Sequence, residues 1–142
     1  MLVRLLYASR SPKPIESSVS ESILTQSRKH NPELGVTGIL CQGGDVYLQV
    51  LEGGRTEVNR LYNQIVQDER HHDVVLLHFE EVTERRFAGW TMGLVNLATV
   101  NPSVLLKYCE RPVLDPYAMS GRAALALLEE LMATAQIMGR AG

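Results

Sequence analysis

Residues 35–52 read Gly-Val-Thr-Gly-Ile-Leu-Cys-Gln-Gly-Gly-Asp-Val-Tyr-Leu-Gln-Val-Leu-Glu. This stretch holds two runs rich in strand-forming residues, 35–42 and 46–52, and the residues Gly43-Gly44-Asp45 stand between them. A short loop of Gly and Asp between two such runs is typical of a β-hairpin. The sequence therefore predicts a pair of adjoining strands here.

Before the hairpin, the chain predicts one strand and one helix. Residues 2–8 are an apolar run that suits a buried strand. Apolar side chains then recur at helical spacing from Ile15 until Asn31-Pro32 breaks the pattern, and Ser18 with Glu21 resembles a capping box at the start.

After the hairpin, the chain predicts a second helix and two more strands. Apolar positions between 58 and 66 follow the spacing of an amphipathic helix. Residues 74–82 and 90–97 are strand-like runs joined by a charged turn. The resulting order βαββαββ indicates an α+β, ferredoxin-like sandwich: a mixed, mainly antiparallel five-stranded sheet with two helices on one face.

The tail beyond this region predicts helices that cover the other face of the sheet, or another subunit. Asn101-Pro102 is suited to open a short helix and Arg111-Pro112 to close it. A second helix is indicated by an apolar stripe at helical period, made of Ala124, Leu127, Leu128, Leu131, Met132 and Ala135. We therefore expect a domain over 1–97 and a helical extension over 98–142.

Composition narrows the class of protein. The 142 residues include 14 basic and 16 acidic side chains, so the formal net charge of −2 gives no support to a nucleic-acid or membrane-surface partner. Neither a signal peptide nor a membrane-spanning segment is evident, and two cysteines without metal-ligand spacing favour a reduced, cytoplasmic protein.

Sequence motifs of common enzymes are missing. Neither a phosphate-binding loop, a nucleophile elbow nor a dinucleotide fingerprint occurs, which argues against an enzyme. The pair His71-His72 could suggest a metal site, but adjacent side chains point in different directions and no other ligand cluster completes it. We expect no metal.

Polar side chains stand on elements that otherwise look buried. Tyr7 ends the first strand, His30-Asn31 closes the first helix, and Gln49 lies in the middle of a strand. Side chains of a strand alternate between faces, so Gln49 shares a face with Tyr47 and Leu51 and is expected to point toward the helices. Buried polar groups need partners, so these groups either satisfy each other or face a polar ligand.

Five separated motifs, in order and at suitable spacing over residues 2–97, resemble the BLUF family of blue-light sensors using FAD. They are Leu6-Tyr7-Ala8-Ser9; Asn31 with Gly35-Val36-Thr37-Gly38-Ile39-Leu40; Tyr47-Leu48-Gln49-Val50-Leu51-Glu52-Gly53; Asp68-Glu69-Arg70-His71; and Phe87-Ala88-Gly89-Trp90-Thr91-Met92. Any one of them alone would be weak evidence.

The resemblance implies a photochemical relay on a flavin held between the two helices. Tyr7 would donate an electron and a proton to the excited flavin, and Gln49 would bridge the phenol to the flavin ring and change its hydrogen bonds. An amide can do so because it has both a donor and an acceptor end. Trp90 and Met92, two apart on one strand, are expected to share a face and compete for the place near Gln49.

The same resemblance implies which residues hold the cofactor. Asn31 would bind the pyrimidine edge of the ring with His30 beside it, and Ile23 and Ile65 would clamp the ring. The remaining residues of the expected site, on the side of the phosphates or beside Gln49, are Lys29, Asp68, Arg70, His71 and Met92. FAD is the expected cofactor, although FMN or riboflavin would satisfy the ring contacts, and Gln64 stands where some members carry Arg.

Plainer interpretations of these residues stay open. Tyr7 could be a core aromatic, Gln49 a sheet residue paired to backbone, and His30-Asn31 a helix cap. The protein is accordingly expected to be a photoreceptor that signals to a protein partner or through its own oligomer. The alternatives are a cofactor-free ferredoxin-like interaction or oligomerisation module and a small flavin reductase.

Overall fold

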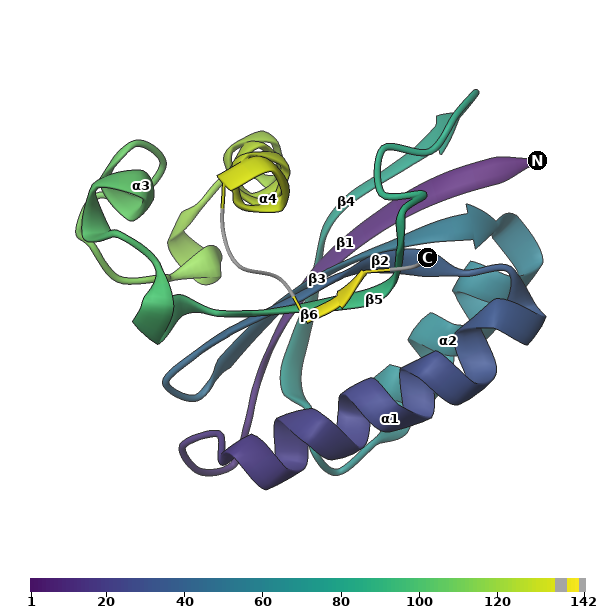
Figure 1. Ribbon diagram of the computed structural model, residues 1–142, viewed down its shortest axis with the longest axis horizontal. Coiled ribbons are helices and arrows are strands. Elements are labelled where there is room, and N and C mark those ends of the chain that lie inside the picture. The colour runs from purple at the N-terminus through teal and green to yellow at the C-terminus, as the bar shows by residue number, and fades with distance from the viewer. Residues whose placement is uncertain (135–137, 141–142) are drawn as a thin grey trace.

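A computed structural model describes residues 1–134 and 138–140 (Figure 1). The strands are β1 (Leu2–Arg10), β2 (Thr37–Gly43), β3 (Val46–Gly54), β4 (His72–Val82), β5 (Trp90–Asn96) and β6 (Met138–Arg140). The helices are α1 (Ser17–Leu34), α2 (Arg55–Gln67), α3 (Pro102–Leu106) and α4 (Gly121–Thr134), with the 3-10 turns η1 (Leu97–Thr99) and η2 (Pro116–Ala118).

The strands form one mixed sheet in the order β4-β1-β3-β2-β5-β6. All pairings are antiparallel except that of β2 with β5, which is parallel. The expected five strands are all present, and the hairpin of β2 and β3 occupies the middle of the sheet. The short strand β6, which the sequence analysis did not anticipate, pairs with the outer edge of β5.

The two faces of the sheet carry separate helical layers, as Figure 1 shows. Helices α1 and α2 cover one face and the tail helices α3 and α4 lie over the other, as expected. The side chains of β3 alternate between these two layers. Tyr47 and Leu51 pack on the α1 and α2 side, while Val46, Leu48 and Val50 pack on the tail side.

Two hydrophobic cores follow from this arrangement. We call the first the helix-side core; its buried members are Val3, Leu5, Tyr7, Ile23, Leu24, Val36, Leu40, Tyr47, Leu51, Val58, Met92 and Leu94. We call the second the tail-side core; its buried members are Leu6, Ile39, Cys41, Val46, Leu48, Val50, Phe87, Trp90, Val95, Leu97, Leu105, Leu114, Ala124, Leu125, Leu127, Leu128 and Leu131.

The first helix differs from its prediction at both ends. It begins at Ser17 after an extended Glu16, so Ser18 lies inside the first turn and not at a capping-box position. It also continues through Pro32 to Leu34, because a proline in the last turn removes only one backbone donor. The end is set instead by Gly35, whose φ of 68° lets the backbone amide of Val36 close onto the Asn31 carbonyl at 3.0 Å.

The tail contains the two predicted helices, with one boundary moved. Asn101 caps α3 through its side-chain oxygen, which accepts from the Ser103 amide at 3.0 Å. The helix ends at Leu106, well before Arg111-Pro112. Beyond it, the amides of Lys107 and Tyr108 bond to the carbonyls three residues back, Val104 and Leu105, at 3.3 and 3.0 Å, so the last turn tightens to 3-10 geometry. The stripe on α4 is buried at Ala124, Leu127, Leu128 and Leu131, and Met132 is half-buried, while Ala135 lies outside the described residues.

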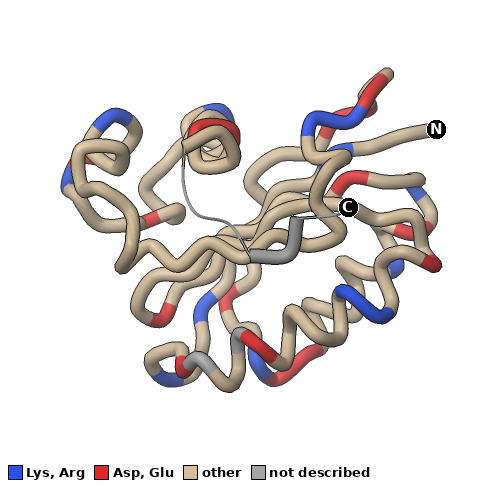
Figure 2. Tube along the Cα trace, viewed as in Figure 1, with Lys and Arg blue, Asp and Glu red and all other residues tan. Residues whose placement is uncertain are grey.

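One buried charge cluster lies on the tail side of the sheet. Arg4 donates to Glu52 at 2.8 Å and also to Glu80, and the carboxylate of Glu52 accepts from the backbone amides of Arg86 and Phe87 at 3.0 and 2.6 Å. Elsewhere acidic and basic positions are interspersed along the chain (Figure 2). In the described part of the chain, no helix has the length and apolar character needed to cross a bilayer.

Candidate functional site

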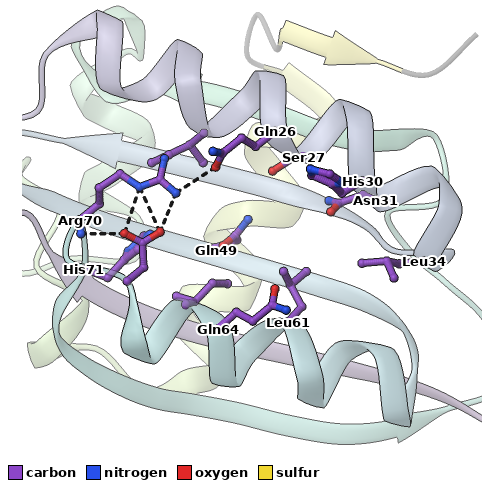
Figure 3. Close-up of a pocket in the computed structure, with 13 residues that line it drawn as sticks. Gln26, Ser27, His30, Asn31, Leu34, Gln49, Leu61, Gln64, Arg70 and His71 are labelled. Carbon is purple, nitrogen blue, oxygen red and sulfur yellow. Dashed lines mark hydrogen bonds and ion pairs between the residues drawn. The ribbon is translucent and has the colours of Figure 1, made fainter.

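A pocket of about 210 Å³ lies between α1 and α2, with the sheet as its floor (Figure 3). Its α1 wall consists of Ile23, Gln26, Ser27, His30, Asn31 and Leu34. Its α2 wall consists of Leu61, Gln64 and Ile65, and Asp68, Arg70 and His71 close one end. Gln49 rises from β3 into the centre of this space, as its position in the strand predicts.

The floor of the pocket carries a three-residue hydrogen-bond chain. Tyr7 lies directly opposite Gln49 in the pairing of β1 with β3, and its buried hydroxyl donates to Gln49 Oε1. The other end of the same amide, Nε2, donates to the sulfur of Met92 at 3.2 Å. Because a thioether is a weak acceptor, the amide N–H can leave this second bond and donate to a better acceptor at little cost.

The phenol of Tyr7 is held neutral. Burial raises the pKa of Tyr7 above its usual range, and the neighbouring ring of Tyr62, at 5.7 Å between centroids, adds to the apolar surroundings. Loss of the hydroxyl proton alone is therefore unfavourable. The proton can leave together with an electron, however, because Gln49 Oε1 already accepts a hydrogen bond from it.

Trp90 and Met92 lie on opposite sides of the sheet, which corrects the expectation that they share a face. Met92 belongs to the helix-side core and contacts Gln49, whereas Trp90 belongs to the tail-side core. Trp90 is the first residue of β5, and the parallel ladder to β2 begins only at Gly93, so strict alternation does not extend to it. Gln49 therefore has Met92, and not Trp90, as its neighbour on β5.

The end of α1 supplies the amide expected at the pocket. Asn31 is buried and its Nδ2 donates to the Thr91 carbonyl at 3.3 Å, which ties α1 to the strand that carries Met92. His30 lines the pocket from an exposed position. Lys29 is exposed and does not line the pocket, so the structure does not bring it together with the other expected residues.

Arg70 closes one end of the pocket as a strap between elements. Its guanidinium pairs with Asp68 at 2.6 Å and reaches across to Gln26 Oε1 on α1 at 3.0 Å (Figure 3). The hydrogen bonds from Arg70 lower the pKa of Asp68, so the carboxylate stays charged in this pair. The pair is partly exposed, and it orients Arg70 more than it stabilises the fold.

His71 turns inward from the same turn and lies under the pocket wall. Its Nδ1 is 2.7 Å from Ser9 Oγ, and its ring is 5.0 Å from that of Tyr47. Burial lowers the pKa of His71 to about 4, so the ring is neutral at physiological pH. His72 points to solvent, and the described residues include no group of three metal-ligating side chains.

The structure thus gathers most of the expected site and adds to it. Ile23 and Ile65 face the pocket from opposite walls, as the resemblance implies. The sequence analysis missed Gln26, Ser27, Leu34 and Leu61. A signal for the α1 residues existed, because positions 23, 26, 27, 30, 31 and 34 follow the spacing of one helical face.

Comparison with known families identifies this arrangement. Residues 2–93 match the family described as sensors of blue-light using FAD, BLUF. The chain belongs to the BLUF family. The matched region includes the whole pocket and the bond between Tyr7 and Gln49, so it is a blue-light-sensing flavin domain.

Individual BLUF proteins show the same relationship. The chain is 34% identical over 99 residues to the blue light- and temperature-regulated antirepressor BluF of Escherichia coli (strain K12), covering 68% of this chain and 24% of that protein. It is 34% identical over 92 residues to the photoactivated adenylate cyclase subunit beta of Euglena longa, covering 64% and 11%. The chain therefore spans a quarter or less of these curated relatives.

A solved structure matches over nearly the full length. The photo-activated state of BlsA has a TM-score of 0.84 and 30% identity, and the match covers 96% of this chain and 98% of that one. The tail helices and the BLUF region are thus arranged as in another short chain.

The BLUF pocket fits a flavin ring on the chemistry of its walls. A flat, largely apolar ring with polar edges needs aliphatic side chains above and below and amides at its rim. Ile23 and Ile65 supply the first, and Gln49 and Asn31 supply the second. The weak bond of Gln49 Nε2 to sulfur and the long bond of Asn31 Nδ2 to carbonyl are both contacts that a better acceptor could replace.

Proposed function

We propose that the protein is a blue-light photoreceptor whose switch is the hydrogen-bonded pair of Tyr7 and Gln49. The observation that carries this proposal is the bond from the buried Tyr7 hydroxyl to Gln49 Oε1, with Gln49 standing in the pocket. Through this bond, a change at a ligand in the pocket reaches a buried phenol by way of a single side chain.

A bound flavin would supply blue-light absorption and, once excited, a strong demand for one electron. Tyr7 would be the residue that supplies this electron, with its hydroxyl proton moving toward Gln49 Oε1, and both would return to Tyr7 when the charges recombine. Loss of the hydroxyl proton from Tyr7 would remove the hydrogen bond that Gln49 Oε1 accepts, so the Gln49 amide would change its hydrogen bonds. Rotation or tautomerisation of the amide breaks its contact with the Met92 sulfur and offers a new donor to the pocket.

Residues around the ring are proposed in distinct roles. Asn31 and His30 bind the polar edge of the ring, and Ile23 and Ile65 hold its two faces by apolar burial. FAD is the proposed flavin, with FMN or riboflavin as the alternatives, because the strap made by Arg70, Asp68 and Gln26 borders the pocket end where a longer side chain would leave. His71 lies beside that end.

Lys29 is proposed in a lesser role. It is exposed beyond the pocket wall, so it could reach only a phosphate that projects out of the pocket. Loss of Lys29 is accordingly expected to weaken binding of FAD and to leave binding of riboflavin unchanged.

The proposed output leaves through β5 and the tail. Gln49 contacts β5 through Met92, and Asn31 contacts it through the Thr91 carbonyl. Strand β5 runs into η1 and the helices beyond residue 97. We propose that 1–97 is the sensor and that 98–142 is the element that contacts a protein partner or a second copy of the chain. The protein is proposed to act by this change of contacts and not as an enzyme, in a reducing compartment such as the cytoplasm, where both free thiols persist.

Absorption spectroscopy tests the proposal directly. The purified protein should be yellow and show a small red shift of the flavin bands under blue light that reverses in the dark. Tyr7→Phe and Gln49→Ala should keep the colour and lose the shift. Tyr117→Phe is the matched control, because that hydroxyl bonds to the Asp73 carbonyl and neither residue lines the pocket, and it should photocycle normally.

Two outcomes would contradict the proposal in different ways. A protein that stays colourless after flavin supplementation would leave the cofactor-free interaction module as the better interpretation. A normal light-induced shift in Tyr7→Phe or Gln49→Ala would keep the flavin but remove these two residues from the switch.

A further inference from the structure

Ser9 and His71 form a buried pair that the proposed switch does not use. Ser9 is fully buried on β1, two residues after Tyr7 and on the same face. The register of β1 with β4 shifts between Ala8 and Arg10, so Ser9 has no partner residue on β4. His71, the residue just before β4, meets Ser9 there instead.

The turn that precedes β4 fixes where His71 lies. The His71 amide donates to the Asp68 carbonyl at 3.0 Å, and the Asp68 carboxylate accepts from the Arg70 amide at 2.9 Å. Arg70 then extends over the pocket to α1 while His71 turns toward the sheet. The ring of His71 is also enclosed by two phenol rings, Tyr47 at 5.0 Å and Tyr7 at 6.1 Å between centroids.

The donors and acceptors of the Ser9 and His71 pair decide which ring nitrogen of His71 carries the proton. His71 is neutral because burial lowers its pKa, so it has one N–H and one bare nitrogen. Among the described side chains, Ser9 Oγ has one hydrogen-bond partner, which is His71 Nδ1 at 2.7 Å. If Nδ1 carried the proton, the serine proton would be buried without an acceptor, which disfavours that tautomer roughly fivefold or more.

We propose that Ser9 is a positioning residue that donates to Nδ1 of His71 and fixes the Nε2–H tautomer. His71 thereby offers a ring N–H to the pocket that it lines, where the ligand would present an oxygen or nitrogen acceptor. This inference deepens the proposed function and depends on it only for the identity of the ligand. Ser9 itself touches no ligand and acts through His71.

Nitrogen NMR of protein labelled in its histidines tests the tautomer without reference to light. The chain has four histidines, His30, His71, His72 and His78, so the His71 signals can be assigned by their loss in His71→Gln. In the wild-type protein at neutral pH, with or without flavin, Nε2 should show the shift of a protonated nitrogen and Nδ1 that of a bare one. A protonated Nδ1 in the wild type would overturn the proposal without any variant.

Variants of Ser9 test its role. Ser9→Ala should change the tautomer ratio of His71 roughly fivefold or more toward Nδ1–H, and Ser9→Thr, which keeps the hydroxyl, should restore the wild-type ratio. Tyr47→Phe is the matched control because it keeps the ring beside His71 and removes a hydroxyl that has no hydrogen-bond partner in the described structure. An unchanged ratio in Ser9→Ala would overturn the proposal.

The loaded protein separates this inference from the proposed function. Ser9→Ala should shift the dark absorption bands or change the dark-recovery rate several-fold, while Ser9→Thr stays close to wild type. If the tautomer changes but both optical readouts stay as in the wild type, His71 is not a donor to the flavin and the proposal fails. If no flavin binds at all, the proposed function fails while the NMR assignment of the tautomer stands.

Discussion

The two faces of the sheet are built from the same strands but differ in kind. The tail-side core is filled with aliphatic and aromatic side chains, and its largest members on α4 are fully buried. The buried charges on that side, Arg4 and Glu52, are paired with each other. The helix-side core borders a pocket, and buried polar side chains lie in or beside it: Tyr7, Ser9, Asn31, Gln49 and His71. One face therefore holds the protein together, and the other keeps polar groups poised for a ligand at some cost in packing.

Truncating one side chain on each face gives the largest expected contrast. Leu128→Ala in the tail-side core should lower the free energy of unfolding by about 2–5 kcal/mol, because it leaves a cavity in dense packing. Ile65→Ala should cost only roughly 1 kcal/mol in the flavin-free protein, because that side chain already borders a cavity. Urea unfolding of both variants measures the difference.

The same two variants should also differ in the flavin-bound protein. Leu128→Ala should keep the light-induced shift, whereas Ile65→Ala should weaken flavin retention, because it removes apolar contact with the ring. Equal costs of unfolding for the two variants in the flavin-free protein would show that the faces do not differ in packing.

Protonation of the buried His71 should make the free energy of unfolding depend on pH, and this effect should be intermediate in size. The unfolded chain takes up a proton on His71 below about pH 6.5, while the folded protein does so only near pH 4, so the free energy of unfolding falls as the pH drops through this window. The loss should approach about 3 kcal/mol at most. His71→Gln should lack this part of the pH dependence, as measured by urea unfolding from pH 7 to pH 4.

The pH dependence of His71→Gln shows whether His71 is the titrating group. If wild type and His71→Gln lose stability in parallel between pH 6.5 and pH 4, His71 is not the group that titrates in that window.

The smallest expected effect concerns a hydroxyl. Tyr47 is fully buried, and its hydroxyl has no hydrogen-bond partner among the described residues. Tyr47→Phe removes that unsatisfied group and keeps the ring, so the free energy of unfolding should stay the same or rise by about 1 kcal/mol. Thermal unfolding measures it, and a clear loss of stability would mean that the hydroxyl has a partner.

Strand alternation and helical spacing were enough to predict the parts of the fold that repeat regularly. They gave the hairpin, the two helices on one face, the direction of Gln49 and the stripe on α4. The family resemblance gave the pairing of Tyr7 with Gln49, which spacing alone left open, because the two residues are 42 positions apart.

Features that depend on local irregularity were not predictable. The expectation for Trp90 assumed regular alternation where the strand is only beginning, and the end of α1 depended on Gly35 and not on Pro32. The strap from Arg70 to Gln26 and the pair of Ser9 and His71 join residues 44 and 62 positions apart. Such contacts follow from the turn after α2 and from a register shift, which no periodic pattern encodes.

The first residue of α4 limits how the tail can move. A methyl group at Gly121 would stand 2.3 Å from the Leu77 carbonyl oxygen on β4, so the helix begins against the strand with room only for hydrogen. At that end α4 cannot be pressed closer to the sheet. Any side chain in place of Gly121 would therefore push the start of α4 off β4, and the tail would lose its close seat on the edge strand.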